Sequence, residues 1–103
     1  MKKCTFYRMM NRNGLKAVKT QGFCETVTDK NGHEFTLCFN KLYDNLWIVT
    51  EQSTGFRVCE GTTRMGAFEN SKYYIDKIYD KVINLGKYID IIAKAYEKDS
   101  KTD

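Results

Sequence analysis

The hydrophobic pattern changes its period near Gly61, and this change restricts the chain to a fold in which strands are followed by helices. Through the first 61 residues, apolar and polar side chains mostly alternate, and glycine-containing turns divide them into short segments. Proline is absent, so no rigid linker separates two parts of the chain. The sequence therefore predicts an α+β fold, with an antiparallel four- to five-stranded meander within residues 3–61 and one long or two shorter C-terminal helices packed on the sheet.

Three turns of similar composition set the expected strand register. They are Arg12-Asn13-Gly14, Lys30-Asn31-Gly32 and Ser53-Thr54-Gly55. Each fits a three-residue hairpin loop that ends with glycine in the left-handed region, where a Cβ would clash. With this loop length, Cys24 lies opposite Cys38, and Glu51 lies opposite Arg57 as an ion pair between neighbouring strands.

The last third of the chain has helical periodicity, beginning after a cap at Thr62 or Thr63. Its apolar stripe is Phe68, Ser71, Ile75, Ile78, Val82, Leu85, Ile89, Ile92 and Tyr96. As one helix, residues 64–97 would be about 50 Å long, whereas strands of six to eight residues give a sheet of only about 20–26 Å. We therefore expect two helices, 63–84 and 87–97, with the break at Asn84-Leu85-Gly86, in preference to one continuous helix. Residues 98–103 are expected to form a disordered tail, which leaves a single domain of residues 1–97.

The second half of this helical region carries more apolar surface than one sheet face can cover. The side chains in excess are Tyr88, Ile91, Ile92 and Tyr96. Three arrangements remain open: they pack on the other side of the sheet, pair with a second copy in a homodimer, or receive a partner. We take these four residues as candidate partner-binding residues.

Positive charge is concentrated at the N-terminus. The net charge is +4, but residues 1–20 contain six lysines and arginines and no acid, giving +6, so the other residues sum to −2. Such asymmetry indicates an acidic partner or a nucleic acid, and we take Arg8, Arg12, Lys16 and Lys19 as candidate contact residues. Phe6 and Tyr7 lie among these cations and would supply rings for stacking on bases. The plainer alternative is a solvated, lysine-rich hairpin.

The sequence contains no catalytic, metal or phosphate-binding motif. The four cysteines are widely spaced, and His33 is the single histidine, so the paired ligands typical of zinc sites are missing. Four reduced, packed thiols are expected, with a bridge between Cys24 and Cys38 as the alternative. His33 is expected to be a solvated turn residue, and the glycines are isolated. We therefore predict a protein that is not an enzyme and binds no metal or cofactor.

Membrane and export signals are also missing from the pattern. No apolar run approaches the roughly 20 residues of a membrane-spanning helix. The basic start is not followed by the apolar segment of a signal peptide. These observations predict a cytoplasmic location and no membrane partner.

One segment carries a resemblance to known proteins. It comprises Trp47-Ile48-Val49-Thr50-Glu51, Thr54-Gly55-Phe56, Gly61-Thr62-Thr63-Arg64 and Ala67. The order W-x-V-T, T-G and G-x-T-R-x-x-A resembles small uncharacterised proteins of bacteriophages and mobile genetic elements. The resemblance covers about a fifth of the chain, and its residues are structural in kind.

The resemblance implies a setting rather than an activity. Small proteins of that setting often occlude a host or defence protein, as anti-CRISPR inhibitors do. We therefore expect an accessory protein of a phage or mobile element that binds and inhibits a host or defence protein, including one within a nucleoprotein complex. The alternative is a small nucleic-acid-binding protein that uses the basic residues 1–20.

Overall fold

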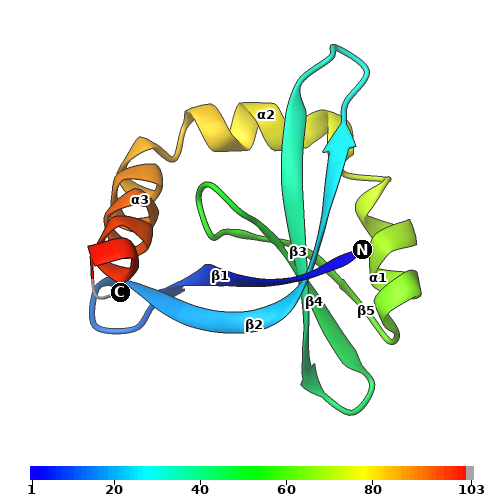
Figure 1. The fold of residues 1–103 in the computed structure, drawn as a ribbon. Helices are drawn as coiled ribbons and strands as arrows, with labels where there is room; N and C mark the ends of the chain where they lie inside the picture. The colour runs from blue at the N-terminus through cyan, green and yellow to red at the C-terminus, as the bar shows by residue number, and fades with distance from the viewer. Residues whose placement is uncertain (102–103) are drawn as a thin grey trace.

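The computed structural model describes residues 1–101, which form one five-stranded antiparallel sheet and three helices (Figure 1). The elements are β1 (Lys2–Asn11), β2 (Leu15–Thr28), β3 (Glu34–Tyr43), β4 (Leu46–Glu51), β5 (Arg57–Gly61), α1 (Arg64–Ser71), α2 (Ile75–Ile83) and α3 (Gly86–Lys101). The strand order is β1-β2-β3-β4-β5, so each strand pairs only with its neighbours in sequence. The predicted α+β meander is thereby confirmed, with five strands.

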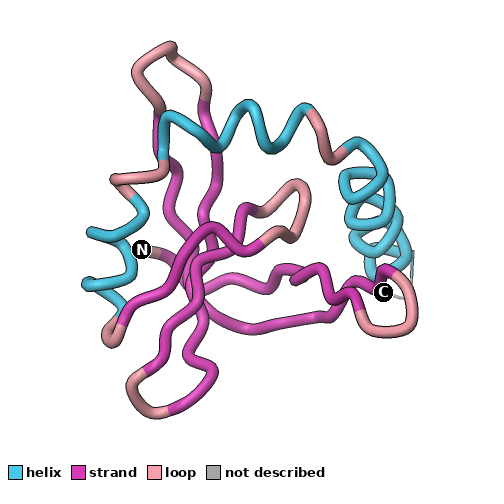
Figure 2. The backbone as a smooth tube through the Cα atoms, turned by 180° about the vertical axis from the view of Figure 1, so that it is seen from behind, coloured by secondary structure: helices cyan, strands magenta, loops and turns pink. Residues whose placement is uncertain are grey.

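The sheet is strongly curled around its longest strand, β2. The first part of β2 pairs with β1 and its last part pairs with β3, so the β1–β2 hairpin runs across the direction of β3 and β4 (Figures 1 and 2). Gly22 lies at this crossing, where an added Cβ would stand 2.1 Å from the carbonyl oxygen of Phe39. At the other end of the hairpin, the Met9 N–H donates to the Gly55 carbonyl at 2.8 Å. The β4–β5 turn thus satisfies part of the open edge of β1.

Both faces of the central strand β3 are buried. Leu37 and Phe39 point to one side and pack with Val49, Ala67 of α1 and Ile78 of α2. The alternating residue Cys38 is also fully buried, on the opposite side. The helices surround the sheet in an arc, with α1 beside β5, α2 spanning one end and α3 beside the β1–β2 hairpin (Figure 1).

The glycine turns set the register as expected for the first two hairpins. Asn11 pairs with Leu15 across a three-residue loop, and Cys24 pairs with Cys38. The third hairpin differs, because Arg57 pairs with Thr50 and the register shifts by one residue there. The expected pair of Arg57 with Glu51 is therefore wrong.

The reason for this shift is a competing role of Glu51 in the β4–β5 turn. Its carboxylate accepts hydrogen bonds from the backbone N–H and the hydroxyl of both Ser53 and Thr54, at 2.6–3.0 Å. Glu51 is almost completely buried, and these donors replace the water that it loses. Because the buried Glu51 carboxylate already accepts all of these hydrogen bonds, it has no free lone pair with which to pair with the exposed Arg57.

The helical region begins and breaks where the sequence indicates. The Thr63 hydroxyl accepts from the Gly66 N–H at 2.9 Å and caps α1. Asn84 ends α2, and α3 begins at Gly86, which confirms the expected break between two helices.

A second break, at residues 72–74, was not expected from the periodicity. There the backbone tightens to three-residue steps, with Tyr73 N–H donating to Asn70 and Tyr74 N–H donating to Ser71. An unbroken helix over residues 64–83 would be about 30 Å long and straight. The break turns the chain so that Ala67 and Ile78 both reach the same core.

The expected tail is also partly wrong, because residues 98–101 continue α3. Asp99 explains the extension: its carboxylate accepts a hydrogen bond from Tyr7 and pairs with Lys19. These contacts connect the end of α3 to the β1–β2 hairpin. The remainder of the predicted tail, residues 102–103, lies outside the described residues.

Candidate functional site: the basic hairpin and helix α3

The structure divides the four basic candidates of the hairpin between two faces. Arg8 pairs with Val18, and Lys16 pairs with Met10, so these four side chains share one face. Lys19 pairs with Tyr7 and lies on the opposite face, under α3. Arg12, the fourth basic candidate, lies in the turn between the two strands and is exposed at its tip.

Helix α3 covers the other face of the hairpin through aromatic and ionic contacts. The rings of Tyr7 and Tyr96 meet edge to face with their centres 4.9 Å apart. The Tyr7 hydroxyl donates to the Asp99 carboxylate, whose Oδ2 lies 3.1 Å from Lys19 Nζ. Helix α3 thus supports one face of the hairpin. On the opposite face, which we call the free face, Lys16 near the tip is exposed, Arg8 is half-buried, and Phe6 at the far end is enclosed.

These contacts shift the acidity of both partners. The hydrogen bond to Asp99, followed by burial, raises the pKa of Tyr7 to about 12. The same hydrogen bond, followed by that from Lys19, lowers the pKa of Asp99 below its usual value. Burial likewise raises the pKa of Tyr96 to about 12. At neutral pH the tyrosines are therefore protonated and the carboxylate is charged.

The apolar candidates of α3 are only partly available to a partner. Ile92 is 1% exposed, and its Cδ1 reaches Gly55, where an added Cβ would stand 2.9 Å away. The hydroxyl of Tyr96 is shielded from solvent. Tyr88 and Ile91 are half-buried. Ile92 and Tyr96 were expected to be apolar surface that a single sheet face leaves uncovered. They instead pack within the same protomer, because the curled sheet places the hairpin and the β4–β5 turn against α3.

Gly55 makes this close packing possible. Its φ of +71° lies in the left-handed region, and an added Cβ would also stand 2.8 Å from the Met9 nitrogen. Beside this contact, a hollow of about 390 Å³ lies between the β4–β5 turn and α3, lined by Ile92 and Tyr96 among others.

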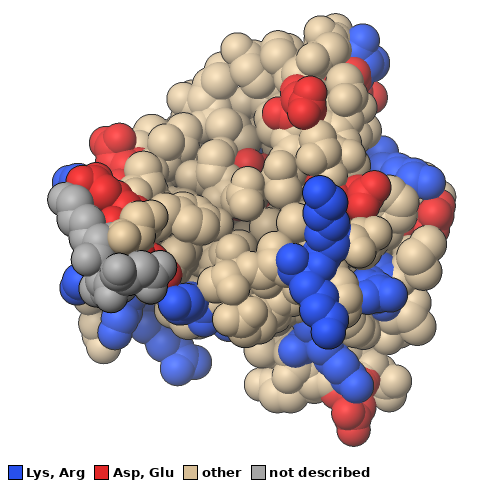
Figure 3. All heavy atoms as spheres, viewed as in Figure 1, with Lys and Arg blue, Asp and Glu red and all other residues tan. Residues whose placement is uncertain are grey.

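The free face of the hairpin combines positive charge with apolar side chains. Arg8 Nε donates to the Thr20 hydroxyl at 3.1 Å, which fixes its guanidinium across the two strands. Met10 and Val18 are half-buried beside it, and Lys16 is exposed. Figure 3 shows lysine and arginine side chains gathered around the hairpin tip at the lower left.

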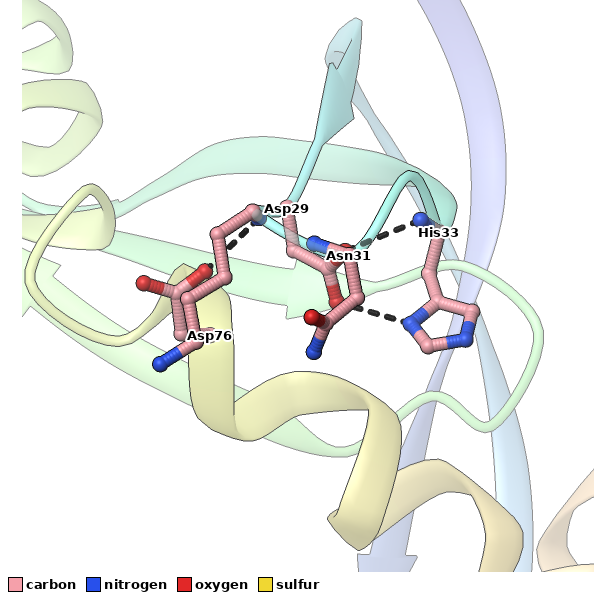
Figure 4. Close-up of polar contacts among 5 residues, drawn as sticks. Asp29, Asn31, His33 and Asp76 are labelled. Carbon is pink, nitrogen blue, oxygen red and sulfur yellow. Dashed lines mark hydrogen bonds and ion pairs between the residues drawn. The ribbon is translucent and has the colours of Figure 1, made fainter.

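His33 is held more tightly than the expected solvated turn residue. Its Nδ1 lies 3.0 Å from Asp29 Oδ2 (Figure 4). Its ring stacks parallel on that of Tyr79, with the ring centres 3.7 Å apart. Asp29 also accepts from the backbone N–H groups of Asn31 and His33 at 2.9 Å. Burial acts to raise the pKa of Asp29, but these hydrogen bonds outweigh it and lower the pKa.

This cluster joins the β2–β3 turn to α2. The Lys30 N–H donates to Asp76 Oδ1 at 2.9 Å, and Figure 4 shows Asp76 rising from α2 towards the turn. A hollow beside His33 also contains Ser53, a residue type that can act as a nucleophile next to a histidine. The Ser53 hydroxyl, however, donates to the Glu51 carboxylate and not to His33. The geometry therefore describes a structural connection between turn and helix.

Three cysteines come together on adjacent strands. Cys24 lies opposite Cys38, and the Cys4 thiol contacts both. Burial, followed by contact with Cys24, raises the pKa of Cys4 to about 12, and burial raises the pKa of Cys38 even more strongly. All four cysteines are free thiols, and within residues 1–101 no group of histidine, cysteine or acidic side chains has the geometry of a metal site. Because their pKa values are raised, the Cys4 and Cys38 thiols are protonated at neutral pH and are poor nucleophiles.

The sequence indicated two of these thiols and missed the third. The register expected for the first hairpin already places Cys4 opposite Gly22, two residues from Cys24. Counting across both hairpins would therefore have found the group. The exposed aromatic pair Tyr73–Tyr74 was missed because it falls in the unexpected helix break.

Comparisons with known proteins add no further constraint. No protein-family model, no curated protein and no solved structure matches the chain. None of the helices in the described residues is both long and apolar enough to cross a bilayer.

Proposed function

We propose that the protein is a non-enzymatic accessory protein of a phage or mobile element that binds a host or defence protein and inhibits it. The observation that carries the proposal is the uncompensated charge of the hairpin. Among the described residues, no carboxylate lies within ion-pair distance of Arg8, Arg12 or Lys16. Such a surface favours an acidic partner and speeds its association.

The composition of the free face supports a protein as this partner. Met10 and Val18 alternate with the cations across the two strands, so apolar and positive groups lie side by side. Methionine and arginine are enriched in protein interfaces, where apolar contact supplies the area and charge supplies orientation. Because α3 supports the opposite face, the hairpin is already ordered, and binding a partner would cost little conformational entropy.

The aromatic residues near the hairpin support the same choice over nucleic acid at this place. Phe6 is fully buried, and Tyr7 is 5% exposed. Neither ring is available to stack on a base, so only phosphate contacts would remain for a nucleic acid on this hairpin.

The proposal is tested by affinity capture from host lysate with the wild-type protein and with the double variant Arg12→Glu/Lys16→Glu. We expect recovery of a defined host protein to fall at least about tenfold for the variant, because attraction becomes repulsion at two positions. Nuclease treatment should leave the wild-type recovery unchanged. The purified partner should then lose activity in proportion to added protein, reaching complete inhibition at a fixed stoichiometry.

A matched control separates the hairpin from net charge. The double variant Lys87→Glu/Lys94→Glu changes the charge equally on exposed positions of α3. It should retain capture. Equal losses in both variants, or loss of the captured protein after nuclease treatment, would contradict the proposal.

A further inference from the structure

A groove runs along β5, the edge strand at the opposite end of the sheet order from β1. One hollow of about 590 Å³ lies between β5 and the helix break, and a second of about 270 Å³ continues beside α2. The two share Arg57, Val58 and Tyr74, so they form one continuous surface, which we call the β5 groove.

Two neighbouring tyrosines line this groove and are open to solvent. Tyr73 is 82% exposed and Tyr74 is 46% exposed. They follow one another in the break between α1 and α2, where the backbone N–H groups of both are hydrogen-bonded. The rings are therefore carried by an ordered backbone but contribute little to the core.

The groove also carries net positive charge. Arg57, Lys77 and Lys81 line it, and the one acid among its lining residues, Glu60, pairs with Arg57. Lys77 and Lys81 are one helical turn apart and so lie on the same side of α2. The preceding acid of α2, Asp76, hydrogen bonds to the β2–β3 turn instead.

We propose that the β5 groove binds single-stranded nucleic acid. Exposed aromatic rings stack on unpaired bases, and flanking cations follow the phosphates, which is how such strands are held without sequence preference. Tyr73 and Tyr74 are the stacking residues, and Lys77 and Lys81 contact the backbone. This function is independent of the protein interface proposed for the hairpin.

The alternative occupant, an extended peptide added to the edge of β5, fits less well. Asn70 Nδ2 already donates to the Glu60 carbonyl at 2.9 Å, so one edge acceptor is occupied. The strand is five residues long and contains a register shift. Short and irregular edges of this kind oppose the addition of another strand.

The proposal is tested by fluorescence anisotropy with a labelled single-stranded oligothymidylate of about ten nucleotides. We expect salt-dependent binding that Tyr73→Ala and Tyr74→Ala each weaken at least about fivefold. Tyr73→Phe should retain the affinity, because it keeps the ring. Lys77→Gln/Lys81→Gln should reduce the slope of log affinity against log salt by about 1.4, the value for two lost phosphate contacts.

Controls and competing probes make the outcome decisive. Lys87→Gln/Lys94→Gln on α3 and Arg12→Glu/Lys16→Glu in the hairpin should leave oligonucleotide binding within twofold of wild type, and circular dichroism should show all variants folded. The proposal fails if wild type does not bind the oligonucleotide, if binding is indifferent to Tyr73→Ala, or if a labelled oligoglutamate peptide binds more tightly with the same tyrosine dependence. If only the hairpin variant lost oligonucleotide binding, the nucleic-acid site would lie on the hairpin, and the proposal for the β5 groove would be wrong.

Discussion

Two aromatic pairs, Phe6–Tyr7 and Tyr73–Tyr74, look alike in the sequence but have opposite environments. Each pair consists of neighbouring rings close to lysines and arginines, as in a nucleic-acid-binding surface. In the structure the first pair is buried, whereas Tyr73 is the most exposed of the large hydrophobic side chains described. The comparison shows that an aromatic pair beside cations indicates a binding surface only once its exposure is known.

The cause of the difference is the element that carries each pair. Along a strand, neighbouring side chains point to opposite faces, so one layer cannot cover both Phe6 and Tyr7. The curled sheet covers both, because the ring of Phe6 lies against the crossing at Gly22 and Tyr7 meets Tyr96 of α3. The Tyr73–Tyr74 pair sits in a break between helices, where no further layer follows.

The largest expected effect is on stability at the buried pair. Phe6→Ala removes a fully enclosed ring and should lower the free energy of unfolding by about 3–5 kcal/mol. Tyr73→Ala should change it by no more than about 0.5 kcal/mol, because that ring is mostly in water. Urea denaturation followed by circular dichroism measures both. Similar values for the two variants would abolish the distinction between the pairs.

A smaller effect is expected where the β4–β5 turn covers the strand of Tyr7. Gly55→Ala introduces a Cβ at a positive φ and against Met9, so it should destabilise the protein by more than about 1 kcal/mol. Gly86→Ala has open space and should leave stability unchanged or raise it by up to about 1 kcal/mol. Thermal unfolding of the two variants compares them directly, and a neutral Gly55→Ala would show that the turn does not hold β1.

The smallest effect concerns the hydroxyl of Tyr7 and depends on pH. Because folding raises the pKa of Tyr7 to about 12, its contribution is complete below the usual value of 10 and is lost as the pH rises through 12. Because folding lowers the pKa of Asp99, that contribution is complete above the usual carboxyl pKa and is lost as the pH falls through the folded value. The stability difference between wild type and Tyr7→Phe should therefore be greatest near neutral pH and narrow towards both extremes. A pH series of denaturation curves tests this, and a constant difference would show that Tyr7 and Asp99 do not interact.

The sequence predicted the fold most reliably where one local rule acts. Strand alternation and glycine turns gave the meander and the pairing of Cys24 with Cys38, and the apolar stripe gave the helices and the break before Gly86. The prediction was wrong where a local contact competed with the rule. Glu51 binds its own turn rather than Arg57, and the helix breaks again at residues 72–74.

The candidate site could be predicted only in part, because exposure depends on contacts distant in sequence. The basic residues of the hairpin could be found by counting charge, and the predicted register already divides them between two faces, but it does not show which of these faces α3 would cover. The apolar residues of α3 could be found by periodicity, but not that Ile92 would meet Gly55. The order of strands and helices was thus determined by the sequence itself, since side-chain periodicity is a local property. Which rings and charges remain at the surface was decided by the tertiary structure alone, since it depends on how far the sheet curls and which element then covers each face.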